Sequence, residues 1–199
     1  MSKGRLIVVE GLDLMGKTTI AKVVAERLNH AVYHSAPYAS YIKKHRELLE
    51  SPAVLLEVEA RSQIFLDGLR AMLPNIKQCL VNGCDVVLDR WKWTTLAYHF
   101  SFDEVFWAKW RYNWKELVSD IPSGDYEFLI HISVDDEAVW RQRLSSRVLT
   151  PDDRLMLLNR NLRYTIWSFY QKMNPNFVVI DNSGTVENSV DQIFKVIGK

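Results

Sequence analysis

The sequence contains only two cysteines among its 199 residues, Cys79 and Cys84. Two thiols are too few for a disulfide framework or a zinc site, so we expect reduced thiols in a cytoplasmic protein. No apolar run approaches the ~20 residues that a membrane-spanning helix needs. No apolar leader precedes the strand-like run that starts at Leu6, so we expect no signal peptide.

An excess of charge of either sign is also missing. The chain has 25 Lys and Arg against 24 Asp and Glu, a formal net charge of +1. This balance gives no support for general attraction to nucleic acid or to a membrane surface, so we expect neither as a partner. The hydrophobic share of 48% suits one well-buried domain and is too little for two large ones. We therefore expect a single domain over residues 1–199.

Short β-branched runs alternate along the chain with stretches of helical spacing. Strands are predicted at 6–9, 32–34, 85–88, 126–132 and 177–180. Helices are predicted at 17–29, 41–50, 52–80, 102–118, 135–147, 152–172 and 186–197. Pro74 should kink or divide the third of these helices. The alternation predicts an α/β fold in three layers, with a five-stranded, mostly parallel sheet between helices on both faces.

The segment from Gly11 to Thr18 matches the pattern G-x-x-x-x-G-K-[ST] and lies between a predicted strand and a predicted helix. Its glycines allow a close approach of the main chain, whose N–H groups and helix dipole then face the phosphates of a nucleoside triphosphate. Lys17 brings a compact positive charge to the outer phosphates, and the Thr18 hydroxyl suits Mg²⁺. A chance glycine-rich turn is the alternative, which the flanking elements disfavour. The residues predicted to bind the nucleotide here are Gly11, Asp13, Met15, Gly16, Lys17, Thr18 and Thr19.

The strand predicted at 85–88 ends in the pair Asp89-Arg90. In phosphate-loop folds such a strand lies beside the first one, and its carboxylate faces the metal ion. Asp89 could organise the water shell of Mg²⁺ or accept a proton from an attacking group. Arg90 could present its guanidinium fork to a phosphate. Singly, these residues could be a turn carboxylate and a surface cation, but their position directly after a buried strand favours the functional interpretation.

These segments resemble the thymidylate kinase family of nucleoside monophosphate kinases. Residues 9–19, with Asp13 inside the loop, are similar to that family's phosphate loop. Residues 89–98 read Asp-Arg-Trp-Lys-Trp-Thr-Thr-Leu-Ala-Tyr. They resemble the family's Asp-Arg-(Tyr/His) motif and its Ser-x-x-Ala-Tyr continuation at the same spacing. The order of elements matches along nearly the whole chain, which implies a P-loop NTPase fold.

The resemblance implies transfer of the γ-phosphoryl group of ATP to a nucleoside monophosphate, with Mg²⁺ at Thr18 and Asp89. Position by position, Asp13 would lie near the 3′-hydroxyl of the acceptor sugar or near its phosphate. Arg90 would hold the acceptor phosphate. The remaining acceptor contacts would be Arg61 on the base, Thr94 near the base edge and Tyr98 against the 2′ position, which favours deoxyribose.

Arg143 and Arg147 resemble the arginines of the family's helical lid, which would cover roughly residues 141–155. Asp153-Arg154 resembles the acidic-basic pair that follows them. The variable positions of the phosphate loop, 12–15, hold no basic residue. Arginines of the lid, which closes over ATP, would then neutralise the negative charge on the phosphoryl group being transferred. The alternative for each arginine is a solvated helix face.

Two departures from the family pattern concern the acceptor. Residues 33–40 contain no arginine, although the family usually has one just after the second strand. Glu57 stands where the family usually has a phenylalanine that stacks on thymine, and His99 stands where glutamine is common. Another aromatic side chain could stack on the base, or the base could differ. These departures weaken the prediction that thymine is the acceptor base more than the prediction that the protein is a nucleotide kinase.

Aromatic residues recur at near-helical spacing between Phe102 and Trp114. Core packing is the plainer interpretation, and a homodimer face is the sharper one, because family members commonly pair through helices. Two functions stay open beside the monophosphate kinase. One is a deoxynucleoside kinase acting on a 5′-hydroxyl, with Glu10 or Asp89 as its base. The other is a regulatory nucleotide-binding protein with little turnover, which the missing acceptor arginine would favour.

Overall fold

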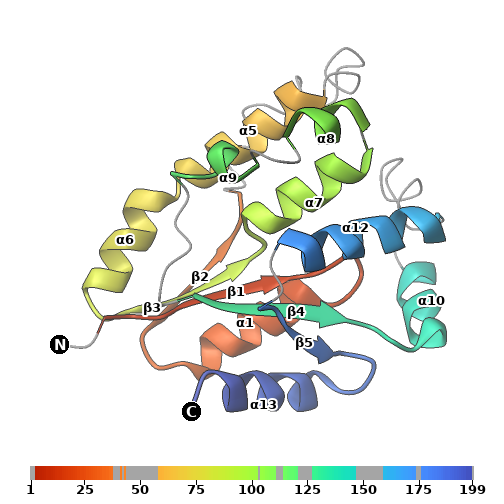
Figure 1. Ribbon diagram of the computed structural model, residues 1–199. Helices are drawn as coiled ribbons and strands as arrows, with labels where there is room; N and C mark the ends of the chain where they lie inside the picture. Colours follow the sequence, from red (N-terminus) through yellow and green to blue (C-terminus); the bar gives the residue numbers. More distant parts are fainter. Residues whose placement is uncertain are drawn as a thin grey trace.

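A computed structural model describes residues 3–37, 41, 43, 58–102, 104–110, 114–120, 127–146, 159–173 and 176–198 (Figure 1). Its centre is a five-stranded sheet in the order β2-β3-β1-β4-β5, and every pair of neighbouring strands is parallel. The strands are β1 (Leu6–Glu10), β2 (Ala31–Ser35), β3 (Asp85–Asp89), β4 (Glu127–Ser133) and β5 (Val178–Asp181). All five predicted strands are thereby confirmed.

The helices form a layer on each face of the sheet (Figure 1). One layer contains α1 (Lys17–Arg27), α10 (Glu137–Ser145) and α13 (Val186–Val196). The other contains α5 (Val58–Arg70), α6 (Leu73–Val81), α7 (Lys92–Phe102), α8 (Glu104–Trp110), α9 (Trp114–Leu117) and α12 (Arg160–Met173). This is the predicted three-layer α/β arrangement.

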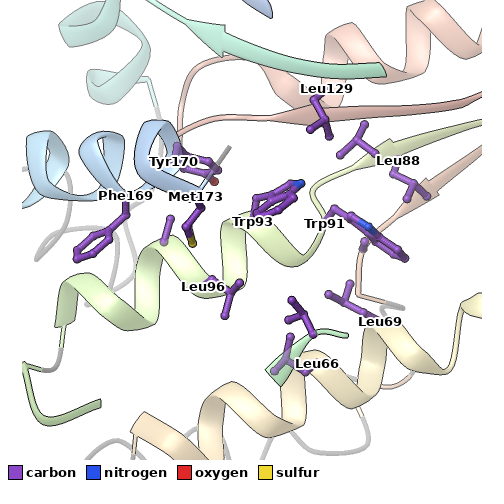
Figure 2. Close-up of a cluster of buried hydrophobic side chains, with 14 of the residues drawn as sticks. Leu66, Leu69, Leu88, Trp91, Trp93, Leu96, Leu129, Phe169, Tyr170 and Met173 are labelled. Atoms are coloured by element: carbon purple, nitrogen blue, oxygen red, sulfur yellow. The ribbon is translucent and has the colours of Figure 1, made fainter. Parts of the chain in front are cut away.

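The alternation of side chains along β1 divides the core in two. Leu6 and Val8 pack toward α5, α7 and α12, whereas Ile7 and Val9 pack toward α1 and α13. Every residue of β1 and β3 is buried, as expected for central parallel strands with helices on both faces. Figure 2 shows part of the first core, where Trp93 and Tyr170 lie between α7, α12 and the sheet, and Leu96 points from α7 toward α5.

Pro74 divides the long predicted helix as expected, because it lies in the first turn of α6, where its missing N–H costs no hydrogen bond. The predicted helix 41–50 lies outside the described residues apart from positions 41 and 43. Helix α7 was not predicted. Its sequence lacks a broad polar face because α5 packs against one side and α12 against another, so the usual amphipathic pattern is missing.

The aromatic stretch contributes to the core through α8. Phe106 is buried, and its ring lies 5.4 Å from that of Phe100 between centroids. Trp107 packs edge-on against Phe169 of α12 at 4.7 Å. For these two residues the core-packing interpretation is confirmed, and the homodimer stays a prediction. Among the described residues, no helix is both long enough and apolar enough to cross a membrane.

Candidate functional site

The phosphate loop leaves the carboxyl end of β1 and runs into α1, as predicted. Gly11 has φ 136° and Gly16, at the start of α1, has φ 90°, a region that favours glycine. A side chain at Gly11 would overlap the carbonyl of Ile132, and one at Gly16 would overlap the side-chain amide of Asn182. Ile132 of β4 and Asn182, which directly follows β5, therefore leave no room for a side chain at either glycine.

Lys17, the first residue of α1, is 4% exposed. Its Nζ donates to the carbonyl of Leu12 at 2.6 Å and lies 4.0 Å from the carboxylate of Asp13. Burial and the nearby Arg90 lower the pKa of Lys17 to about 8, although Asp13 opposes the shift. Because burial destabilises the charged ammonium, a phosphate group bound in the loop would stabilise it.

Thr18 and Asp89 meet where α1 begins and β3 ends. The Thr18 hydroxyl donates to Oδ2 of Asp89 at 2.5 Å, and the Tyr33 hydroxyl approaches the same oxygen at 3.4 Å. The other oxygen, Oδ1, is buried and has no hydrogen-bond partner among the described residues. A hydroxyl beside an unsatisfied carboxylate oxygen is a donor set that suits Mg²⁺, which binds hard oxygen ligands. These two residues could therefore hold the ion.

Asp13, Arg90 and Tyr98 form one polar cluster beside the loop. Nη2 of Arg90 forms an ion pair with Oδ1 of Asp13, and the Tyr98 hydroxyl donates to Oδ2 at 3.1 Å. The same hydroxyl accepts from the Asp13 N–H at 3.2 Å. Burial alone would raise the pKa of Asp13, but the charges of Arg90 and Lys17 outweigh it and lower the pKa to about 2. The cluster therefore pairs a fixed anion with a cation at the edge of the phosphate-binding concavity.

The backbone of Arg90 is unusual, because its φ of 77° lies in the left-handed region that few non-glycine residues adopt. Its N–H donates to the carbonyl of Val9 at 2.9 Å, which ties the residue to β1. Strained backbone of this kind persists only where the surroundings hold it, and it is commonest at functional sites. The conformation turns the chain from β3 into α7 and brings Arg90 and Tyr98 to the same side.

Arg143 of α10 lies under the phosphate loop. Its Nη1 donates to the carbonyl of Met15 at 3.3 Å, and its Nη2 donates to the carbonyl of Asn182 at 2.6 Å. The Asn182 side chain donates to the same Met15 carbonyl at 2.9 Å and accepts from the Ser189 hydroxyl at 2.9 Å. Arg143, from the predicted lid, is thus part of the support of the loop.

Asn182 and Ser189 were not predicted from the sequence. A signal did exist for the first, because Asn182 directly follows β5 at the edge of the sheet where the other strands also deliver polar residues. A second unforeseen feature surrounds Glu10. It accepts hydrogen bonds from the backbone of Trp91 and Thr94 at 2.9 and 3.2 Å, and Thr94 also bonds to Tyr170.

The remaining predicted residues are more dispersed. Thr19 is exposed on α1, next to Thr18. Arg61 lies on α5, close enough to His99 for its charge to act on that ring. Burial, with help from Arg61, lowers the pKa of His99 to about 4. The contact of Thr94 with an acceptor base stays a prediction. Arg147 and Arg154 lie outside the described residues, as do Glu57 and most of the predicted lid.

Comparison with known proteins gives one consistent result. The family model described as thymidylate kinase matches residues 9–193. A probable thymidylate kinase of Pyrococcus horikoshii is 27% identical, over 98% of this chain and 96% of the relative. A probable thymidylate kinase of Archaeoglobus fulgidus is also 27% identical, over 96% of this chain and 94% of the relative.

Solved structures agree on the fold. Thymidylate kinase from Candida albicans superimposes with a TM-score of 0.74 at 20% identity, over 100% of this chain and 92% of that one. A deoxyadenosine kinase from M. mycoides, solved with bound dATP, superimposes with a TM-score of 0.67 at 15% identity, over 98% and 100% of the two chains. Because one of these proteins is named as a nucleotide kinase and the other as a nucleoside kinase, the shared fold does not choose the acceptor.

Proposed function

Because the chain belongs to the thymidylate kinase family, we propose that it transfers the γ-phosphoryl group of ATP to thymidine monophosphate, with Mg²⁺. The observation that carries the proposal is the cluster of Arg90, Asp13 and Tyr98 beside the ammonium of Lys17. It offers one cation for the donor phosphates and a second one for the acceptor phosphate. Phosphoryl transfer depends mainly on such positioning and neutralisation of charge.

The donor would bind with its phosphates in the loop between Gly11 and Thr18. Main-chain N–H groups and Lys17 would neutralise the charge of the phosphates. Arg143 and Asn182, which hold the Met15 carbonyl, keep the loop in shape. Thr18 and Asp89 would hold Mg²⁺, which supplies electrostatic stabilisation to the outer phosphates when it is bound.

The acceptor would place its phosphate at Arg90. The attacking oxygen of a monophosphate already carries negative charge near neutral pH, because its second pKa is about 6. A bond then forms between this oxygen and the γ-phosphorus, while the bond from that phosphorus to the ADP oxygen breaks and ADP leaves. No carboxylate base is required. Arg90 can bridge the Asp13 carboxylate and the acceptor phosphate, since a guanidinium presents five N–H donors.

Sugar and base recognition would fall to α5 and α7. Tyr98 is held by Asp13, so its ring has a fixed place beside the acceptor sugar, where it would crowd a 2′-hydroxyl. Asp13 would contact the 3′-hydroxyl, and Arg61 would approach the base. We also propose that the part of residues 141–155 that follows Arg143 acts as a lid over ATP, with Arg147 as a further source of positive charge, while Arg143 itself supports the loop. We propose in addition that the enzyme is a cytoplasmic homodimer.

The deoxynucleoside kinase is the competing proposal, because the chain also superimposes on a deoxyadenosine kinase. A neutral 5′-hydroxyl needs a carboxylate base. Glu10 is 0% exposed and engaged by backbone N–H groups, so it is not placed to act as that base. Asp89 is the candidate that this proposal would use, because its Oδ1 has no hydrogen-bond partner among the described residues. Steady-state assays with ATP, Mg²⁺ and a panel of nucleosides and monophosphates would separate the two. Activity confined to nucleosides would rule out the monophosphate kinase.

A further inference from the structure

Glu10 is a carboxylate that the reaction described above does not use. It is the last residue of β1 and is 0% exposed. Because side chains alternate along a strand, Glu10 points to the same face as Leu6 and Val8, toward the layer of α7 and α12. A buried carboxylate is costly unless it is well bonded, so its partners indicate why it is there.

Among the described residues, the hydrogen-bond partners of Glu10 are donors at the start of α7 and on α12. Oε1 accepts from the Trp91 N–H at 2.9 Å and from the Thr94 N–H at 3.2 Å. Oε2 accepts from the Thr94 hydroxyl and, at 3.3 Å, from the Tyr170 hydroxyl. Trp91 directly precedes α7 and Thr94 lies in its first turn, where backbone N–H groups have no partner within the helix. Glu10 therefore caps α7 from a neighbouring strand.

The capped turn directly follows Arg90. Two hydrogen bonds hold the left-handed φ of Arg90, 77°. The N–H of Arg90 donates to the carbonyl of Val9, and the N–H of the next residue, Trp91, donates to the carboxylate of Glu10. Val9 and Glu10 are consecutive residues of β1, so the strand holds the chain both at Arg90 and just after it. This is the kind of surrounding structure that a strained residue needs.

We propose that Glu10 is a positioning residue, which fixes Arg90 for the acceptor phosphate by holding the first turn of α7 against β1. Tyr170 extends this arrangement to α12, since its hydroxyl lies 2.8 Å from that of Thr94. Figure 2 shows Tyr170 on α12 and Trp91 directly before α7. The assignment of Arg90 to the acceptor phosphate rests on the proposed function.

Glutamine is the conservative substitution that the geometry allows. Its amide oxygen can accept from the two backbone N–H groups as Oε1 does, and its amide NH₂ can donate to the Thr94 hydroxyl. The network then runs in the opposite direction, with Thr94 donating to Tyr170. Glu10→Gln therefore keeps the position of α7, whereas Glu10→Ala removes the acceptors and Glu10→Asp draws them back by one methylene.

The experiment compares Glu10→Ala, Glu10→Asp and Glu10→Gln with Asp85→Ala, a control that removes a largely buried carboxylate at the amino end of β3, where it pairs with Arg5. For Glu10→Ala we expect the KM for thymidine monophosphate to rise about tenfold or more, the scale of effect expected for a displaced binding group. In the same variant the KM for ATP should change by less than about threefold. Glu10→Gln should keep both KM values close to wild type. In Asp85→Ala the KM for thymidine monophosphate should not rise more than the KM for ATP. Equal effects of Glu10→Ala on both KM values, or a Gln variant as impaired as the Ala variant, would overturn the proposal. If Glu10→Ala does not fold, the same split is required of Glu10→Asp.

Amide hydrogen exchange gives a readout that does not depend on turnover. In Glu10→Ala, but not in Glu10→Gln or Asp85→Ala, the amides of Trp91 and Thr94 should lose protection by about tenfold or more. Unchanged protection would overturn the capping role even if activity fell. A wild-type protein without turnover on any monophosphate would instead refute the proposed function, and the exchange data would still report whether Glu10 holds α7.

Discussion

The guanidinium of Arg90 forms an ion pair with the carboxylate of Asp13, although 77 positions separate them in the sequence. The pair joins the phosphate loop to the residue before α7, and in the proposed reaction it would link the donor side of the site to the acceptor side. In the absence of nucleotide, Asp13 supplies the negative charge that the acceptor phosphate would supply in the complex. The arginine is thus held in place before the acceptor arrives.

Replacing Arg90 should impair use of the acceptor much more than use of the donor. For Arg90→Ala we expect kcat/KM for thymidine monophosphate to fall between about tenfold and about a hundredfold, the range for loss of a charged hydrogen bond. ATP should still bind with nearly unchanged affinity, measured by calorimetry. Arg90→Lys keeps the charge but loses the fork, and it should recover only part of the loss. An unchanged KM for the acceptor in Arg90→Ala would show that its role is wrongly assigned.

Tyr98 combines a ring that limits space with a hydroxyl that holds Asp13, and two variants separate these roles. Tyr98→Ala should lower the preference for deoxyribonucleotides over ribonucleotides by about tenfold, because the 2′-hydroxyl gains room. Tyr98→Phe retains the ring, so the preference should persist while the rate falls modestly. The measurement is the ratio of kcat/KM for the deoxy and ribo forms of the same monophosphate. A ratio that Tyr98→Ala leaves unchanged would remove the proposed gate.

Asp89 should set the requirement for Mg²⁺. Asp89→Asn keeps the size of the side chain but loses the charge of the carboxylate whose Oδ1 is buried and unpaired in the described part of the chain. We expect the Mg²⁺ concentration for half-maximal activity to rise about tenfold, and chelation with EDTA to abolish turnover of the wild type. The check is a titration of activity with Mg²⁺ at a fixed concentration of ATP. A superimposable titration curve for the variant would contradict the metal assignment.

Asn182 should matter for the donor alone. Its side chain donates to the Met15 carbonyl and fills the space beside Gly16, so Asn182→Ala should loosen the phosphate loop. We expect the KM for ATP to rise about fivefold, in keeping with loss of a buried hydrogen bond, while the KM for the acceptor changes little. Ser189→Ala is the matched control and should show a smaller change, because it removes the bond to Asn182 and two longer contacts to backbone carbonyls but leaves the Asn182 side chain on Met15. A larger effect of Asn182→Ala on the acceptor than on ATP would contradict this role.

Ionisation of Glu10 should lower the free energy of unfolding as the pH rises. Burial raises its pKa from 4.5 to about 7, although Thr94 and Arg90 oppose the shift. Because the folded state prefers the protonated form, its contribution is complete below pH 4.5 and is lost as the pH rises through about 7. At about 1.4 kcal/mol per pKa unit, this loss amounts to about 3 kcal/mol. The glutamine in Glu10→Gln cannot ionise. As the pH rises from 4.5 to 8, the free energy of unfolding of this variant relative to wild type should therefore increase by up to this amount.

The measurement for this prediction is urea unfolding of both proteins from pH 4.5 to pH 8. The difference between them is the informative quantity, because buried His99 and His131 act in the opposite direction. Burial lowers their pKa values to about 4 and about 3, so they destabilise the fold as the pH falls. Both histidines are present in each protein, and their effect cancels in the difference. A difference that stays constant with pH would mean that Glu10 is ionised throughout.

The phosphate loop could be predicted from the sequence because its signal is local. The motif consists of a β-branched run, two spaced glycines and a helix, all within thirty residues. The positive φ angles of Gly11 and Gly16 explain why glycine stands at these two positions. Asp89 and Arg90 could be predicted from their place at the end of a buried strand. Thr18 was predicted from the phosphate-loop motif, and the role of Asp13 from the resemblance to the thymidylate kinase family.

The supporting residues could not be found in this way, since they depend on contacts between segments far apart in the chain. Asn182 meets Met15 across 167 positions, and Glu10 meets Tyr170 across 160. Helix α7 escaped prediction for a related reason. It is covered by two other helices, so tertiary packing replaces the polar face from which a helix is normally inferred.

The most direct test of the central claim compares phosphoryl transfer from ATP to thymidine monophosphate with transfer to thymidine, for the purified protein with Mg²⁺. Lys17→Ala, which lacks the cation of the phosphate loop, serves as the blank. We expect thymidine diphosphate to form. The kcat/KM for the monophosphate should be at least about a hundredfold above that for thymidine, because only the monophosphate has a phosphate that can bind Arg90. Transfer to thymidine but not to its monophosphate would contradict the account, and so would transfer by Lys17→Ala at the wild-type rate.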